Sequence, residues 1–148
     1  MSVEIEGYGE IEGAGFEIHD ASFSSCLIGH ARLERLWTGA SHSPDGPRHI
    51  RRFTVASEGR SLDGGEVFAE CSGGLFDGFR FDTDGRIWSS AADGVHCLNR
   101  DGHLIGKIGV PEVVSTLTFG GKRRNRLFIF GNTSLYSVYL AIDGAALG

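Results

Sequence analysis

The side chains that could take part in chemistry are scattered along this chain, and few have the spacing of a known type of site. Cys26, Cys71 and Cys97 are odd in number and lack metal-ligand spacing, which favours three reduced core thiols. His42 and His49 flank a loop that contains Pro44 and Pro47, but their separation is not that of a zinc site. Neither group therefore predicts a metal centre.

Carboxylates are better candidates, although most of them follow a turn pattern. Four aspartates lie between strand-like runs and are interpreted as turn residues: Asp82, Asp84, Asp93 and Asp101. Asp77 differs because it opens a strand-like run, before Gly78, where it can shape a turn. One carboxylate cannot hold a cation alone, because a calcium-type site takes about 6–8 oxygen ligands.

Nucleophilic and anion-binding groups have less support. The pairs Ser24-Ser25 and Ser89-Ser90 lack the G-x-S-x-G context of a nucleophilic serine. The basic run at residues 122–126 is interpreted as a solvated hairpin tip rather than an anion site. His96, next to Cys97, is expected at the surface or between sheets.

The stretch from Asp77 to Leu98 predicts the element on which the rest depends, an antiparallel meander. Strand-like runs at Gly78–Asp82, Arg86–Ser90 and Gly94–Leu98 are separated by Asp-Gly turns, the strongest short-range hairpin signal. A fourth run, His103–Val110, follows the turn at 99–102. Four such strands in sequence form one up-and-down sheet.

The pattern recurs with an offset of roughly 40 residues, the period typical of propeller blades. Ser115–Phe119, Arg126–Gly131 and Ser134–Leu140 form the second copy. Arg48–Val55 and Glu66–Glu70, with a turn at 57–59, resemble a blade that lacks its first half. The sequence predicts an all-β partial propeller of about three blades, each a four-stranded antiparallel sheet.

The N-terminal part has weaker signals. Residues 1–15 are acidic and Gly-rich and are interpreted as a tail or one extra edge strand. Phe16–Ile18 and Cys26–Gly29 are weak strand candidates, whereas Arg32–Trp37 is a better one. Thr38–Pro47 reads as a loop of Gly, Ser, Pro and Asp.

The expected organisation is a single domain over residues 1–148 with four parts. These are the tail at 1–15, an N-terminal segment with the broken blade at 16–70, an intact blade at 77–110 and the last blade at 115–148.

Composition limits the classes of function. The 148 residues suffice for one domain with a core, and the net charge of −5 argues against nucleic acid as a partner. The sequence has no run of 18 apolar residues, so no membrane span is predicted. The N-terminus has no basic segment of the kind that begins a signal peptide. A cytoplasmic protein is expected.

The pattern D-G-x-x-x-D-x-x-G-x-x-W between Asp77 and Trp88 resembles the senescence-marker-protein, regucalcin and gluconolactonase family. The resemblance continues through 106–121 and 127–139 and covers the chain from about Thr38 to its C-terminus; 16–39 resembles the beginning of bacterial members. It implies a six-bladed β-propeller that hydrolyses sugar lactones with one divalent cation in the central channel.

Several features of that family are missing here. After an opening like Leu33–Gly39, the family continues with an E-G-P motif whose Glu binds the metal, whereas this chain has Ala40-Ser41-His42. The N-x-x-D/N-D and N-G motifs are also absent, so the chain resembles an internally shortened member. Only Asp77 matches a metal-binding position, which implies at most a weakly held cation: calcium, magnesium or zinc.

The number of blades implies a partner. A propeller needs at least about four blades to close, and the run Phe128–Phe130 is apolar on both faces. We expect a homodimer that closes a six-bladed ring, using this run and the blade side that carries Phe53 and Phe68. The resemblance implies that a strand such as Leu33–Trp37 can pair with the last blade and close the ring. We expect it instead to join the broken blade beside Arg48–Val55, because short connections usually join spatial neighbours.

Three functions remain open from the sequence. The chain is a lactonase-like hydrolase acting on a small sugar lactone, a catalytically inactive binding or structural propeller module, or an assembly in which copies rebuild a closed ring. Metal titration separates the first from the second, and the mass in solution tests the third. The substrate and the origin of the shortening, natural or engineered, stay open.

Overall fold

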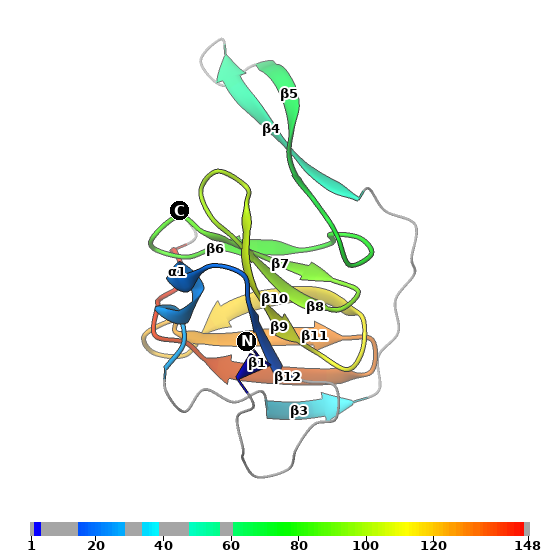
Figure 1. The fold of residues 1–148 in the computed structure, drawn as a ribbon, viewed down its shortest axis with the longest axis vertical. Coiled ribbons are helices and arrows are strands. Elements are labelled where there is room, and N and C mark those ends of the chain that lie inside the picture. The colour runs from blue at the N-terminus through cyan, green and yellow to red at the C-terminus, as the bar shows by residue number, and fades with distance from the viewer. Residues whose placement is uncertain (1, 4–14, 29–33, 39–47, 57–60, 147–148) are drawn as a thin grey trace.

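The computed structural model describes residues 2–3, 15–28, 34–38, 48–56 and 61–146, and more than half of these residues lie in antiparallel β-strands (Figure 1). The elements are β1 (Ser2–Val3), β2 (Gly15–Ile18), α1 (Ala21–Ser24), β3 (Glu34–Thr38), β4 (His49–Ala56), β5 (Ser61–Glu70), β6 (Phe79–Phe81), β7 (Ile87–Ala91), β8 (Gly94–Leu98), β9 (Leu104–Gly109), β10 (Val114–Gly120), β11 (Arg126–Gly131) and β12 (Ser134–Tyr139).

The first sheet contains the predicted meander, in the order β6-β7-β8-β9. Its turns follow from local chemistry. Gly94 has a φ of 131°, in the range that glycine favours, and the Asn99 side chain accepts hydrogen bonds from the backbone N–H groups of Asp101 and His103. Local turn residues therefore determine this sheet.

The N-terminal segment extends the same sheet. β2 pairs with β9, and β1 pairs with β2, so the alternative of an extra edge strand within residues 1–15 is confirmed for Ser2–Val3. The candidate strand at Cys26–Gly29 is wrong for its described part: Leu27 makes one isolated bridge to Leu140, and Gly29 lies outside the described residues. Helix α1 precedes it, with the Asp20 carboxylate accepting a hydrogen bond from the Ser22 N–H.

The second sheet has the order β10-β11-β12-β3. Its first three strands match the predicted second copy of the meander. The predicted place of Leu33–Trp37 is wrong, because β3 pairs with β12, with Leu135 opposite Trp37, and not with β4. The edge of β12 offers unpaired backbone groups, and β3 satisfies them and completes a four-stranded sheet. Leu33 itself lies outside the described residues.

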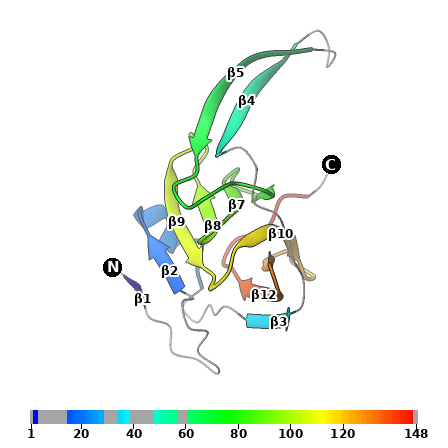
Figure 2. The ribbon, with the colours of Figure 1, turned by 90° about the vertical axis from the view of Figure 1, so that its right-hand side faces the viewer.

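Strands β4 and β5 form a two-stranded hairpin that projects from one end of the molecule (Figures 1 and 2). The register shifts twice along it, between Ile50 and Arg51 and between Arg52 and Phe53. β5 is longer than the predicted strand at Glu66–Glu70, since it begins at Ser61. The predicted turn at 57–59 lies outside the described residues.

The main core lies between the two larger sheets. Trp88 is fully buried at its centre, with its ring edge-on to Phe119 at 6.1 Å between centroids and tilted against Phe23 at 5.8 Å. Leu127 and Ile129 reach this core from β11. Burial of these large apolar side chains holds the two sheets together.

A smaller cluster lies on the opposite face of the first sheet, at the foot of the hairpin. Its buried members are Ala69, Phe76, Ile87 and Leu98. Only the foot of the hairpin is fixed by this packing, since the exposed large side chains Phe53, Val55 and Leu62 lie farther along the two strands.

Candidate functional site

Asp77, the residue that the family resemblance singles out, is exposed and lies two residues before the start of β6. The neighbouring Gly78 is held against the next sheet. Its N–H donates to the Ser90 hydroxyl at 2.8 Å, and that hydroxyl lies 3.1 Å from the Gly78 carbonyl oxygen and 3.3 Å from that of Ser115. A Cβ at position 78 would lie 2.5 Å from Thr116 Oγ1. Asp77 therefore stands at a fixed point where the two larger sheets approach each other.

Other metal ligands are not gathered around this point within the described part of the chain. None of its His, Cys, Asp and Glu residues form a group of three that could hold a metal ion. His42 lies outside the described residues, and His49 begins β4 in the hairpin. The described residues thus place Asp77 without the further carboxylates or imidazoles that a tightly bound cation needs.

Asp82, predicted to be an ordinary turn residue, is the most deeply buried carboxylate of the described chain at 2% exposure. It accepts hydrogen bonds from the Arg86 N–H at 2.9 Å and from Trp88 Nε1 at 2.9 Å, and Arg86 Nη1 lies 3.1 Å from it. Burial acts to lower the pKa of Arg86, but the hydrogen bonds to Asp82 and Asp84 together with the neighbouring charges outweigh it and raise the pKa. These contacts make Asp82 a structural residue.

Asp93, His96 and Lys107 form a second polar cluster, which the sequence did not predict as a unit. Asp93 Oδ1 lies 2.7 Å from His96 Nε2, and Oδ2 accepts from Lys107 Nζ at 2.9 Å. His96 is buried rather than at the surface, with its ring edge-on to Phe76. The only sign of this pairing in the sequence is the three-residue spacing between Asp93 and His96 across the turn at Gly94.

The surroundings favour a charged Asp93 carboxylate beside Lys107 and a neutral His96 imidazole. Burial lowers the pKa of His96, against the opposing effect of the Asp93 hydrogen bond. Burial acts to raise the pKa of Asp93, but the hydrogen bonds from Lys107 and His96 outweigh it and lower the pKa. The hydroxyl of Ser89, the register partner of His96 on β7, donates to the carbonyl oxygens of Gly78 and Ser90. The arrangement orients a turn and does not activate a nucleophile.

The cysteines are free, and the prediction of reduced thiols is confirmed for the structure. Cys26 and Cys97 are buried in the main core, and Cys71 is half-buried. Burial raises the pKa of both Cys71 and Cys97, which keeps these two thiols protonated and poorly nucleophilic.

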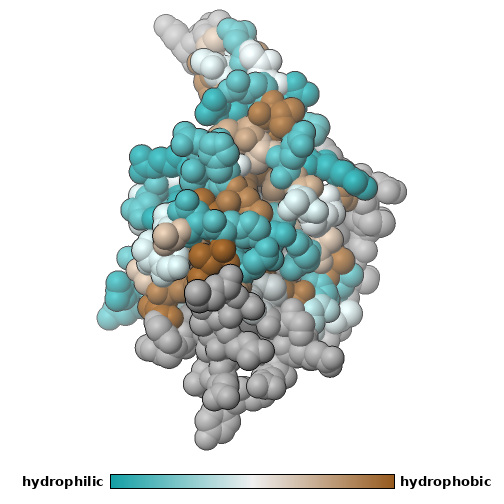
Figure 3. All heavy atoms as spheres, viewed as in Figure 1, coloured by the Kyte–Doolittle hydropathy of each residue, from teal (hydrophilic) through white to brown (hydrophobic). Residues whose placement is uncertain are grey.

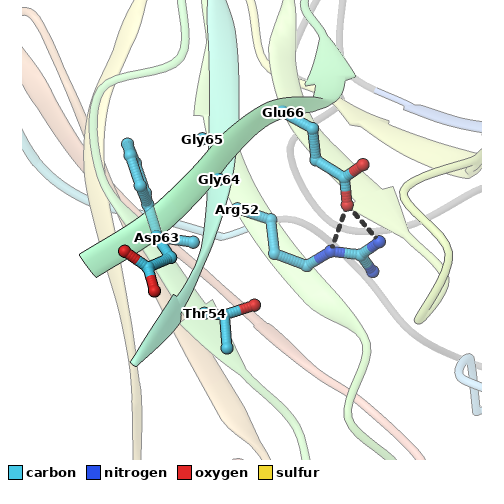
Figure 4. A pocket seen from close by; sticks show the side chains of 7 residues that line it. Arg52, Thr54, Asp63, Gly64, Gly65 and Glu66 are labelled. Atoms are coloured by element: carbon cyan, nitrogen blue, oxygen red, sulfur yellow. Dashed lines mark hydrogen bonds and ion pairs between the residues drawn. The ribbon is translucent and has the colours of Figure 1, made fainter. Parts of the chain in front are cut away.

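A hollow of about 290 Å³ lies on the hairpin, between residues of β4 and β5 (Figure 4). Its lining includes Arg52 and Glu66, whose side chains point toward each other and form an ion pair. Asp63 and Thr54 complete the polar part of the lining. With its charged pair mutually satisfied and both side chains largely exposed, the hollow lacks a group poised for catalysis.

None of the helices in the described part of the chain is long and apolar enough to cross a membrane.

Comparisons with known proteins give the relationships of the chain. Residues 43–133, more than half of the chain, match the family described as the SMP-30/gluconolactonase/LRE-like region. No curated protein matches the chain significantly. Among solved structures, a gluconolactonase from Xanthomonas campestris is 37% identical with a TM-score of 0.57, covering 62% of this chain and 30% of that one.

Two further structures extend the likeness. A protein assigned as a gluconolactonase is 32% identical with a TM-score of 0.62, covering 68% of this chain and 34% of that one. The calcium-binding protein regucalcin from Agrobacterium tumefaciens is 20% identical with a TM-score of 0.55, covering 66% and 40%, and shows the fold alone. The chain thus spans between about a third and two fifths of the length of these structures, and its fold is that of a partial β-propeller.

Proposed function

The chain belongs to the SMP-30/gluconolactonase/LRE-like family, and on that basis we propose that it is a relative of the sugar-lactone hydrolases with little or no lactonase activity of its own. The names of two similar structures, both described as gluconolactonases, support a sugar lactone as the ancestral substrate class. Three free thiols support a reducing compartment such as the cytoplasm.

The observation that carries this proposal is the position of Asp77. Lactone hydrolysis by a metal enzyme needs a cation that polarises the carbonyl and activates water, and the protein must fix that cation with several ligands. Asp77 matches the family's ligand position and is held where the two larger sheets meet, yet the described residues add no group of three ligands there. Such a site supports weak cation binding and not an active metal centre.

A second function, a propeller module that assembles as a homodimer, is favoured by the exposed sheet faces. Phe79 and Phe81 remain 39% and 48% exposed on one side of the structure, and Phe130 and Tyr139 are 38% and 44% exposed on β11 and β12. In a two-fold ring, two Asp77 carboxylates would share one channel and would repel each other. A weakly held calcium or magnesium ion between them would relieve that repulsion.

The test combines binding and activity. We expect calcium to raise the melting temperature of the wild type slightly and to leave Asp77→Asn unaffected, with gluconolactone hydrolysis at the spontaneous rate in both. Asp101→Asn is the matched control, because this exposed aspartate lies in a turn. A cation-dependent rate that disappears in Asp77→Asn would overturn the inactive assignment. Equal melting temperatures with and without calcium would leave Asp77 as a turn residue only.

A further inference from the structure

The projecting hairpin is amphipathic across its two faces. Cross-strand partners in an antiparallel pair share a face, and the register pairs Val55 with Leu62 and Arg51 with Val67, while Phe53 faces Gly64. These pairs gather the exposed large apolar side chains of the hairpin on one face; they are Phe53, Val55, Leu62 and Val67, between 46% and 66% exposed. Arg51 lies on the same face, where its guanidinium donates to the Gly65 carbonyl oxygen.

The opposite face of the hairpin is polar. Thr54 pairs with Asp63, and Arg52 pairs with Glu66, whose side chain it contacts in an ion pair. Figure 4 shows this polar pair between the two strands. A ribbon that serves only to span solvent has no need of an apolar face, so one face of this hairpin is suited to contact another surface.

The outer face of the second sheet also carries large apolar side chains that the described residues leave partly exposed. β11 turns Leu127 and Ile129 inward to the main core, so the alternate residues Phe128 and Phe130 face outward. Leu135 and Tyr139 stand beside them, as the register partners of Phe130 and Arg126. The Arg126 guanidinium carbon lies 5.2 Å and 5.0 Å from the ring centroids of Phe128 and Tyr139.

These two surfaces lie at opposite ends of the molecule. The hairpin projects from one end in both ribbon views, whereas β12 and β3 lie at the other (Figures 1 and 2). Figure 3 shows hydrophobic residues reaching the surface at the foot of the hairpin and on the body below it. In this structure the hairpin of a chain does not reach the second sheet of the same chain, so the contact proposed below is between molecules.

We propose that the apolar face of the β4–β5 hairpin docks on the outer face of the β10-β11-β12-β3 sheet of a second copy of this chain. In a two-fold dimer, each copy supplies one hairpin and one sheet, so the same contact forms twice and the assembly closes. This inference rests on the proposed assembly as a homodimer and names the surfaces that make it.

The exposed area agrees with a dimer of this kind. In a two-fold dimer each chain buries both its hairpin face and its sheet face. The exposed large side chains of these two faces carry roughly 500 Å² of apolar area per chain, taking about 200 Å² for a whole aromatic side chain and about 150 Å² for an aliphatic one. A stable interface buries roughly 800 Å² per partner, of which somewhat more than half is apolar, so the area agrees with such a dimer.

The first experiment compares two neighbouring positions on β4. Val55→Lys places a charge on the apolar face, and Thr54→Lys places the same charge on the polar face of the same strand. We expect light scattering to give twice the 15.9 kDa mass of one chain for the wild type and for Thr54→Lys. Val55→Lys should raise the dimer dissociation constant on the order of tenfold or more, with an unchanged circular dichroism spectrum.

The second experiment tests whether the two surfaces contact each other. Phe130→Lys places a charge on the docking face of the sheet and leaves the apolar face of the hairpin unchanged. Val55→Lys places a charge on the hairpin face and leaves the sheet face unchanged. Each variant alone is expected to be monomeric, but an equimolar mixture retains one intact hairpin–sheet contact and should form a heterodimer. If Phe130→Lys does not fold, Tyr139→Lys on the same face replaces it.

The outcomes separate the two proposals. A wild-type monomer at high concentration overturns both the homodimer and the docking. A dimer that Val55→Lys does not weaken leaves the homodimer and overturns the role of the hairpin. Monomers in the mixture, when each variant alone is also monomeric, indicate contact between two hairpins or two sheets and overturn the hairpin-to-sheet geometry.

Discussion

Replacing Asp82 by alanine is expected to be one of the most damaging single substitutions in the first sheet. The carboxylate is 2% exposed and accepts from the backbone N–H groups of Asp84 and Arg86 and from the indole N–H of Trp88. Alanine leaves the fully buried Trp88 Nε1 without its acceptor, which costs about 1–3 kcal/mol. It also separates Arg86, whose side chain is 16% exposed, from its buried partner.

Breaking a buried ion pair by removal of one partner costs about 3–5 kcal/mol. Arg86 keeps its contact with Asp84 at 2.9 Å and some solvent, so the lower half of that range applies. The two effects share atoms and do not add in full. We therefore expect Asp82→Ala to lower the free energy of unfolding by about 3–5 kcal/mol, measured by urea denaturation with tryptophan fluorescence.

Asp84→Ala is the matched control, since that side chain is 58% exposed and loses only its surface ion pair with Arg86. Its expected cost is about 0–1 kcal/mol. The loss of unfolding free energy for Asp82→Asn should lie between those of Asp82→Ala and Asp84→Ala, because the amide oxygen still accepts from Trp88 but carries no charge. A loss below about 1 kcal/mol for Asp82→Ala would refute the view that this carboxylate organises the blade.

Two other substitutions test the turns and loops. At Glu112, burial acts to raise the pKa, but hydrogen bonds from Tyr136, Thr133 and Ser134 outweigh it and hold the pKa below its usual range. This stabilisation is present above the unfolded pKa and is lost as the pH falls through the folded pKa. Glu112→Gln should therefore lower the melting temperature near neutral pH, and its melting temperature should converge with that of the wild type in acid. Parallel curves of melting temperature against pH would contradict this. Gly94→Ala should lower the free energy of unfolding, measured in urea, by about 2–4 kcal/mol, because the added Cβ lies 2.0 Å from the Ile108 carbonyl oxygen. Gly121→Ala, whose added Cβ has its nearest atom at 3.7 Å, should lower it by only about 1–2 kcal/mol. Equal losses for the two variants would contradict the steric reason.

The burial of polar side chains was the least predictable part of the candidate site. The sequence showed Asp82, Asp93 and His96 in or beside turns, but their roles depend on which face of the sheet is covered. His96 is buried because the segment that follows the hairpin brings Phe76 against it. For Asp77 the resemblance indicated a ligand position, and the described structure adds the contacts that hold its neighbour Gly78.

The sequence by itself determined the two meanders, because their Asp-Gly and Asn-containing turns and alternating strands act over only a few residues. Only the tertiary structure decided the partner of β3, which pairs with β12 from the far end of the chain instead of its sequence neighbour β4. Strand pairing at such separation is decided by which edge remains open once the local hairpins have formed, and residue order does not encode this directly. For the same reason, the hairpin β4–β5 retains an apolar face that the described residues of its own chain leave exposed.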